Sequence, residues 1–109
     1  MDKHLVNREG IEKITLRPTI PCFCRIGEQY MIPTVQVDVV VGDEYGELIS
    51  LHEDYQDLSK DPLSLEELTA AVLQVTLSYY PTAKAIEVIV DNSAGKHMAV
   101  TLSKRYVRK

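Results

Sequence analysis

The sequence has few cysteines, no long apolar run and no tryptophan. Its two cysteines, Cys22 and Cys24, are separated by one residue, a spacing that strains a disulfide bridge. We therefore expect two free thiols, as in a reducing compartment. No apolar stretch approaches the ~20 residues that span a bilayer, and the first ten residues lack the apolar segment of a signal peptide. These absences predict a cytoplasmic protein without a membrane partner.

Several common functional motifs are also missing. The chain contains no GxGxxG, no phosphate-binding glycine loop and no GxSxG nucleophile motif, so the usual nucleotide-binding and hydrolase signatures are excluded. We found no internal repeat, low-complexity tract or linker. A chain of 109 residues is the size of one domain. We therefore expect a single domain over residues 1–109.

Positive charge is in the minority, with 12 Lys and Arg against 16 Asp and Glu and a net charge of -4. This balance argues against a large nucleic-acid footprint. Four basic residues near the end of the sequence could contact a phosphate, but we expect a solvated terminus. They are Lys104, Arg105, Arg108 and Lys109.

An apolar fraction of 45% and a charged fraction of 26% are typical of a packed globular protein.

Alternation of apolar and polar residues predicts two strands in the first half. The clearer signal covers residues 34–41, where four valines recur at every second position. A looser alternation covers residues 11–19, and Pro18 limits it to an edge or bulged strand. Residues 27–33 are predicted to connect the two strands as the loop of an antiparallel hairpin. The polar residues 1–10 are expected to fray.

Apolar spacing changes to a helical period after Gly42. Between Glu47 and Leu58 the apolar residues are three, four and three positions apart, which predicts one buried stripe of a short helix. Asp61 and Pro62 are expected to end this segment. The stripe consists of Leu48, Leu51, Tyr55 and Leu58.

A second helix has the strongest local signal in the chain. Ser64 followed by Glu67 forms a capping box, and Leu63 with Leu68 supplies a hydrophobic staple. The helix is predicted to run from Leu65 to about Tyr80 and to end before Pro81. Its predicted buried face consists of Leu65, Leu68, Val72, Val75 and Tyr79.

Two further strands are predicted over residues 85–91 and 98–106, with turn residues at 92–95 between them. In the first, Ile86, Val88 and Val90 share one face, and Met98, Val100 and Leu102 do so in the second. The order of elements is therefore ββααββ. It predicts an α+β fold in which helices cover one face of a four-stranded antiparallel sheet.

Some apolar groups have no evident place in one such core. Ile89 is predicted on the outer face of its strand, and the adjacent Tyr79 and Tyr80 are not expected to face the same core. The edges of the sheet also need cover. We therefore expect the protein to be a homo-oligomer.

The two cysteines admit three interpretations. Cys22 and Cys24 could supply half of a metal site with His52 or His97, although neither histidine has a familiar ligand spacing. Cys24 or Cys22 could be a nucleophile if a nearby group lowers its pKa or transfers a proton. Both could also be small buried apolar residues. The candidate helper groups are Arg25, Glu28 and His52.

Glu66 is the second residue of the predicted long helix. A carboxylate there is favoured by the helix dipole, which is a sufficient structural explanation. Alternatively, a carboxylate at this position could accept two hydrogen bonds from the amino and ring-nitrogen edge of a guanine-like base. The residues alone leave both interpretations open.

The order of elements resembles the tunnelling fold (T-fold), a family of small ββααββ domains that assemble into barrels and bind purines or pterins between subunits. Within it, the chain from Cys24 onward resembles the nitrile reductases that act on 7-cyano-7-deazaguanine. Those enzymes have a nucleophilic cysteine, a glutamine soon after it, an alternating strand and a signature of the form E-x-K-S-L-K. The matching positions without a gap are Cys24, Gln29, Thr34, Val35, Val37, Glu47, Ser50, Leu51 and, further on, the base-binding Glu66.

The resemblance implies a role for each of these positions. Cys24 would add to the nitrile carbon and form a covalent thioimide, and Glu66 would hold the base. Glu47, Ser50 and Leu51 would belong to the substrate-binding signature. The substrate would be a purine-like or pterin-like molecule, either free or within a nucleic acid such as tRNA, bound at an interface between subunits.

The sequence also departs from the reductase pattern. The aspartate that donates a proton in the family is Met31 here, so Glu28, the nearest acid, is the candidate donor. The family histidine before the base-binding glutamate is Leu65. The two signature lysines that serve the nicotinamide cofactor are Ile49 and His52. We therefore expect no cofactor and disfavour reduction by NADPH.

The length of this chain fits a related, shorter group better: the reductase-like archaeosine synthases, which have lost the cofactor site and add ammonia to the thioimide to form an amidine. Two alternatives remain. One is a pterin enzyme resembling dihydroneopterin aldolase, in which Glu66 holds the base and no cysteine is required. The other is a T-fold binding or assembly module without catalysis. No metal is expected in any of these cases.

Overall fold

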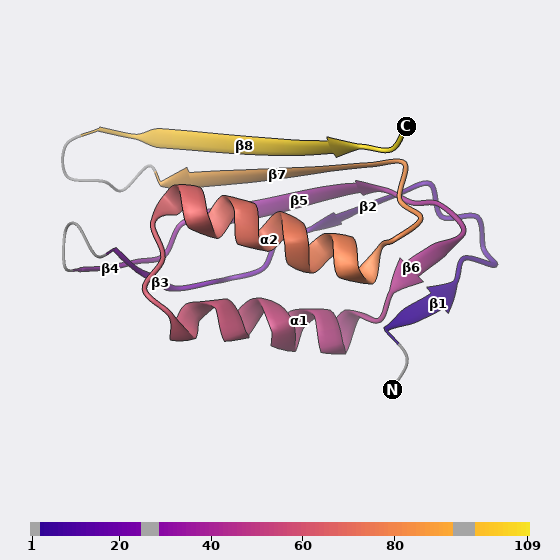
Figure 1. Cartoon of the computed structure of the whole chain (residues 1–109), viewed down its shortest axis with the longest axis horizontal. Coiled ribbons are helices and arrows are strands. Elements are labelled where there is room, and N and C mark those ends of the chain that lie inside the picture. Colours follow the sequence, from indigo (N-terminus) through magenta and orange to yellow (C-terminus); the bar gives the residue numbers. More distant parts are fainter. Residues whose placement is uncertain (1–2, 25–28, 93–97) are drawn as a thin grey trace.

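The computed structural model describes residues 3–24, 29–92 and 98–109, with the backbone alone for 22–24 and 29–31. The elements follow the predicted order with four short strands added (Figure 1). The main strands are β2 (Lys13–Leu16), β5 (Thr34–Val40), β7 (Ala85–Asn92) and β8 (Val100–Val107). The helices are α1 (Leu48–Asp57), the 3-10 turn η1 (Leu58–Lys60) and α2 (Leu65–Tyr79). The short strands are β1 (His4–Val6), β3 (Cys22–Cys24), β4 (Gln29–Met31) and β6 (Glu44–Gly46).

The main sheet has the strand order β2-β5-β7-β8, and every neighbouring pair is antiparallel. Both helices lie on one side of it (Figure 1). The predicted α+β arrangement of a four-stranded antiparallel sheet under two helices is therefore confirmed. Within the described residues β2 and β8 are the edge strands of this sheet, and the sheet does not close into a barrel.

The core lies between the sheet and the helices. Alternate residues of β5 and β7 point toward α2, and the register pairs Val35 with Val90, Val37 with Val88 and Val39 with Ile86. All six side chains are buried, as the valine alternation predicted. From the helices Leu51, Leu68 and Val72 complete this layer.

Helix capping follows the sequence signals. The Ser64 hydroxyl accepts a hydrogen bond from the Glu67 amide at 3.1 Å, and the Glu67 carboxylate accepts one from the Ser64 amide at 3.1 Å. This reciprocal pair is the predicted capping box, and α2 begins at Leu65 as expected.

The buried face of α2 is wider than predicted. Leu68, Val72 and Tyr79 are buried as expected, whereas Leu65 and Val75 are only partly buried. Thr69, Leu73 and Thr76 are buried in addition, because α2 packs against both the sheet and α1. Thr76 is accommodated there by two hydrogen bonds: its hydroxyl donates to the Val72 carbonyl at 2.7 Å and lies 2.6 Å from the Tyr55 hydroxyl.

Three local predictions were wrong. Within the described residues 3–10 the chain does not simply fray, because β1 pairs with β6 and the Glu47 amide donates to the Lys3 carbonyl. The predicted loop over residues 27–33 contains β4, which pairs with β3. Met98 lies outside β8 and is 73% exposed. Very short strands pair through backbone groups, so their side-chain pattern carries little signal.

The prediction for the two tyrosines was also wrong, since Tyr79 and Tyr80 are both buried. The Tyr79 hydroxyl donates to the Asp54 carboxylate at 2.6 Å, and burial followed by this bond raises the pKa of Tyr79 to about 12. Tyr80 packs against Gly46, where an added Cβ would lie 3.0 Å from the Tyr80 ring. Both rings are therefore enclosed without a second copy of the chain.

Replacing Ser64 by alanine tests the capping box. We expect Ser64→Ala to lower the free energy of unfolding by about 1 kcal/mol, because the Glu67 amide in the first turn of α2 loses the hydroxyl that accepts its hydrogen bond. Urea unfolding followed by circular dichroism measures the change.

Ser78→Ala is the matched control, since this exposed hydroxyl only donates to the Val75 carbonyl within the helix. It should change the free energy of unfolding by less than about 0.5 kcal/mol. Equal effects of the two substitutions would contradict a special role for the cap.

Candidate functional site

Glu66 lies in a pocket between the start of α2 and the edge strand β8. The pocket has a volume of about 270 Å³. Glu66 is exposed, and no hydrogen bond or ion pair within the described residues involves its side chain. Its neighbour Glu67 has the capping role instead, so the Glu66 carboxylate is available to a ligand. The lining of this Glu66 pocket consists of Glu66, Thr69, Ala70, Leu102, Ser103 and Lys104.

A second pocket lies at the opposite edge of the sheet, between α1 and the end of β2. It has a volume of about 200 Å³ and contains Leu51 of the predicted signature. Its walls are mainly apolar, with Arg17 and His52 as the groups that can carry positive charge. We call it the Leu51 pocket, and it is lined by Leu16, Arg17, Pro18, Leu48, Leu51, His52 and Tyr55.

Glu47 is the N-cap of α1. Its two carboxylate oxygens accept hydrogen bonds from the Ile49 amide at 3.1 Å and the Ser50 amide at 2.7 Å. The Ser50 side chain, followed by these backbone bonds, lowers the pKa of the Glu47 carboxyl. The carboxylate is thus engaged in holding the start of α1. This geometry suits a residue that positions the Leu51 pocket better than one that contacts substrate.

Of the two predicted catalytic residues, Cys24 and Glu28, the structure describes only the backbone of Cys24. The backbone of Cys24 ends β3 and pairs with Gln29, but its side chain, like that of Cys22, lies outside the described residues. Glu28 and Arg25 also lie outside them. Strand β3 packs against η1 and follows β2 along the chain, so Cys24 belongs to the segment that continues the β2 edge.

The signature residues and Glu66 are far apart within one chain. The helices are antiparallel, so α1 begins where α2 ends (Figure 1). Contacts at that end include Lys3 with the Tyr79 ring, 5.1 Å from its centroid. Glu66 lies at the other end of the helix pair. A single copy therefore does not bring Glu47 and Ser50 to the Glu66 pocket.

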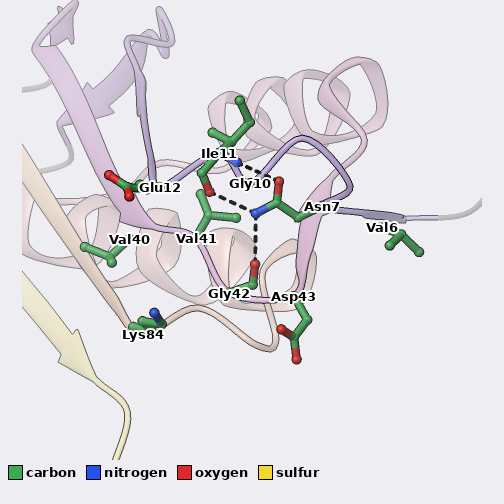
Figure 2. A pocket seen from close by; sticks show the side chains of 10 residues that line it. All are labelled: Val6, Asn7, Gly10, Ile11, Glu12, Val40, Val41, Gly42, Asp43 and Lys84. Carbon is green, nitrogen blue, oxygen red and sulfur yellow. Dashed lines mark hydrogen bonds between the residues drawn. The ribbon is translucent and has the colours of Figure 1, made fainter.

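A further cavity contains none of the predicted site residues. It has a volume of about 680 Å³ and lies where the turn after β1 meets the end of β5 (Figure 2). The Asn7 amide group donates to the carbonyls of Ile11 and Gly42 and accepts from the Ile11 amide. The side-chain amide of Asn7 is therefore engaged in holding this turn.

Two other absences apply to the described residues alone. They contain no group of three or more His, Cys, Asp or Glu side chains that could hold a metal ion. Among the described helices none is long and apolar enough to cross a membrane.

Two basic residues that line these pockets, Lys104 and Arg17, were not predicted as site residues. Lys104 and Arg105 belong to β8, within the strand predicted over residues 98–106, and both side chains are exposed as expected. Arg105 is paired with Glu87 at 3.3 Å, whereas Lys104 lines the Glu66 pocket. The available signal was the interrupted apolar alternation at Lys104, between Leu102 and Tyr106. Arg17 had no comparable signal.

No protein-family model and no curated protein sequence matches this chain. Solved structures do. An archaeosine synthase, QueF-Like, in its apo form has a TM-score of 0.78 and 12% sequence identity, covering 88% of this chain and 94% of that one. A protein named as a dihydroneopterin aldolase, FolB, from Vibrio cholerae has a TM-score of 0.58 and 9% identity, covering 99% of this chain and 98% of that one. With its ββααββ order and antiparallel sheet, the chain has the tunnelling fold, and its structure is similar to that of a QueF-Like archaeosine synthase.

Proposed function

We propose that this chain is a T-fold enzyme that binds 7-cyano-7-deazaguanine, free or within a nucleic acid, and converts its nitrile to an amidine. The observation that carries the proposal is the unengaged Glu66 carboxylate in a pocket of a chain with this fold. The similarity to an archaeosine synthase supports the choice of base.

Glu66 would bind the base through its two oxygens. A guanine-type edge presents a ring N–H and an exocyclic amino group side by side, and a carboxylate accepts both at once. Thr69 and Ala70, one helical turn further on, have small side chains that leave the pocket open. The first turn of α2 also favours the charged carboxylate through the helix dipole.

Cys24 would supply the nucleophile. Its thiol adds across the nitrile, so that sulfur bonds to carbon and the nitrogen gains a proton, giving a thioimide. Glu28 is the proposed acid for that proton. Ammonia then adds to the same carbon, and the thiol leaves with the amidine as product. No electrons are transferred, so this route needs no NADPH, in keeping with Ile49 and His52 at the positions of the family's cofactor lysines.

A complete site would require two copies of the chain. Strands β2 and β8 are the two edges of an antiparallel sheet with four strands, so they run in opposite directions. Edge β8 of one copy can therefore pair with β2 of the next and continue the antiparallel order, and repetition closes a ring. This pairing would bring the Glu66 pocket of one copy beside the Leu51 pocket and the Cys24 segment of its neighbour.

Mass spectrometry of the intact protein tests the chemistry. After incubation with 7-cyano-7-deazaguanine without ammonia, we expect one covalent adduct per chain with the mass of the nitrile. The thioimide forms by addition, so nothing is lost. Cys24→Ala should abolish the adduct.

Cys22→Ala is the matched control and should retain the adduct. Glu66→Gln should slow adduct formation by roughly 10- to 100-fold, since a charged hydrogen-bond partner of the base is lost. Unchanged mass of the wild-type protein with excess nitrile would contradict the proposal.

Mixing two impaired variants tests the shared site. Cys24→Ala and Glu66→Gln subunits, unfolded and reassembled together at equal amounts, should form adduct at about one quarter of the wild-type rate. That is the random fraction of interfaces with both intact residues. Each variant treated alone is the control. No gain on mixing, with normal assembly, would place both residues of a site in one subunit.

A pterin enzyme of the same fold is the second candidate, favoured by the similarity to the dihydroneopterin aldolase structure. Glu66 would hold the pterin in the same way, and Cys24 would have no chemical role. Turnover of dihydroneopterin that survives Cys24→Ala would support this alternative.

A further inference from the structure

Lys104 is a charged residue at a position of β8 where the alternation of the strand predicts an apolar side chain. In β8 the side chains that face the helices are Val100, Leu102, Lys104 and Tyr106, because their partners in β7 include the buried Val88 and Val90. The other three are partly buried, whereas Lys104 is exposed at the edge of the helix layer. A break in an otherwise regular pattern is expected at a functional position.

Glu66 and Lys104 face the same pocket without pairing. Both line the Glu66 pocket, and among the described residues neither side chain takes part in an ion pair or hydrogen bond. Other basic residues of this region are engaged: Arg105 pairs with Glu87, and Arg108 donates to the Thr82 carbonyl. The pocket thus presents an acceptor and a donor of opposite charge with space between them.

The ligand chemistry follows from these two groups. A carboxylate that accepts two hydrogen bonds selects two adjacent donors, and a nearby ammonium selects an acceptor. The edge of a guanine-type base carries such a series: an amino group, a ring N–H and a carbonyl oxygen. An adenine-type edge has its donor amino group where this base has the oxygen.

We propose that Lys104 is a specificity-determining residue that donates to the 6-oxo group of the base held by Glu66. The inference rests on the proposed base-binding role of Glu66 but not on the chemistry of Cys24. Lys104 makes the pocket selective for 6-oxo bases, since a 6-amino group would oppose a donor to a donor. Its amine contacts the ligand and takes no part in bond formation.

Binding measured by calorimetry tests this role. The probes are 7-deazaguanine, which has no nitrile and cannot form the adduct, and its 6-thioxo analogue. The analogue retains both donors for Glu66 but replaces the oxygen by sulfur, a weak acceptor. Wild-type protein should bind 7-deazaguanine about 10-fold more tightly than the analogue, and Lys104→Met should abolish that preference.

Two variants and a third base separate the roles. Lys104→Met should weaken 7-deazaguanine binding by roughly 10- to 100-fold, while Arg105→Met, on the opposite face of the same strand, should leave it unchanged. Loss of the 2-amino group, in 7-deazahypoxanthine, should weaken binding equally in wild type and Lys104→Met, because that group belongs to Glu66.

Each result decides a different question. An undiminished oxo preference in Lys104→Met, or equal weakening of both bases, would overturn the role of Lys104 even if the nitrile adduct forms. Absence of base binding by the wild-type protein would overturn it together with base binding by Glu66. Selective binding without any nitrile adduct would support Lys104 and count against the proposed thioimide chemistry alone.

Discussion

The apolar contact between the helix-facing sides of β5 and β7 and the helix α2 is the interaction on which the rest of the structure depends. Val35, Val37 and Val39 face their partners in β7, and all are buried under the helix. Apolar area removed from water is the dominant favourable term in folding. Because this layer fixes α2 over β7 and β8, it also fixes the position of Glu66 relative to the edge strand.

Much of this architecture follows from local sequence signals. Alternating valines specify a strand with one buried face, and Ser64 with Glu67 specifies the start of α2 to the residue. Those signals involve residues only a few positions apart, so they can be recognised in the sequence without knowledge of the rest of the fold. The wider buried face of α2 was not predictable in this way, because Thr76 is buried with a hydrogen-bond partner, Tyr55 of α1, that only the folded chain supplies.

The candidate site was predictable in part for a similar reason. Glu66 could be singled out because a carboxylate in the first turn of a capped helix has a known direction and charge preference. The place of Lys104 in the candidate site depends on the register of β8 against β7. This register puts Lys104 opposite Val88, and it lines the same pocket as Glu66. Register depends on the pairing of distant segments, and a sequence pattern alone left Lys104 as a surface charge.

The N-cap of α1 has an electrostatic consequence for anionic ligands. A helix start usually offers free amide groups and a positive dipole end, which together attract phosphates. In α1 the amides of Ile49 and Ser50 already donate hydrogen bonds to the Glu47 carboxylate. The chain therefore carries its own anion at this helix end, which repels a second one. Any attraction of the neighbouring Leu51 pocket for negative charge must come from Arg17 and His52.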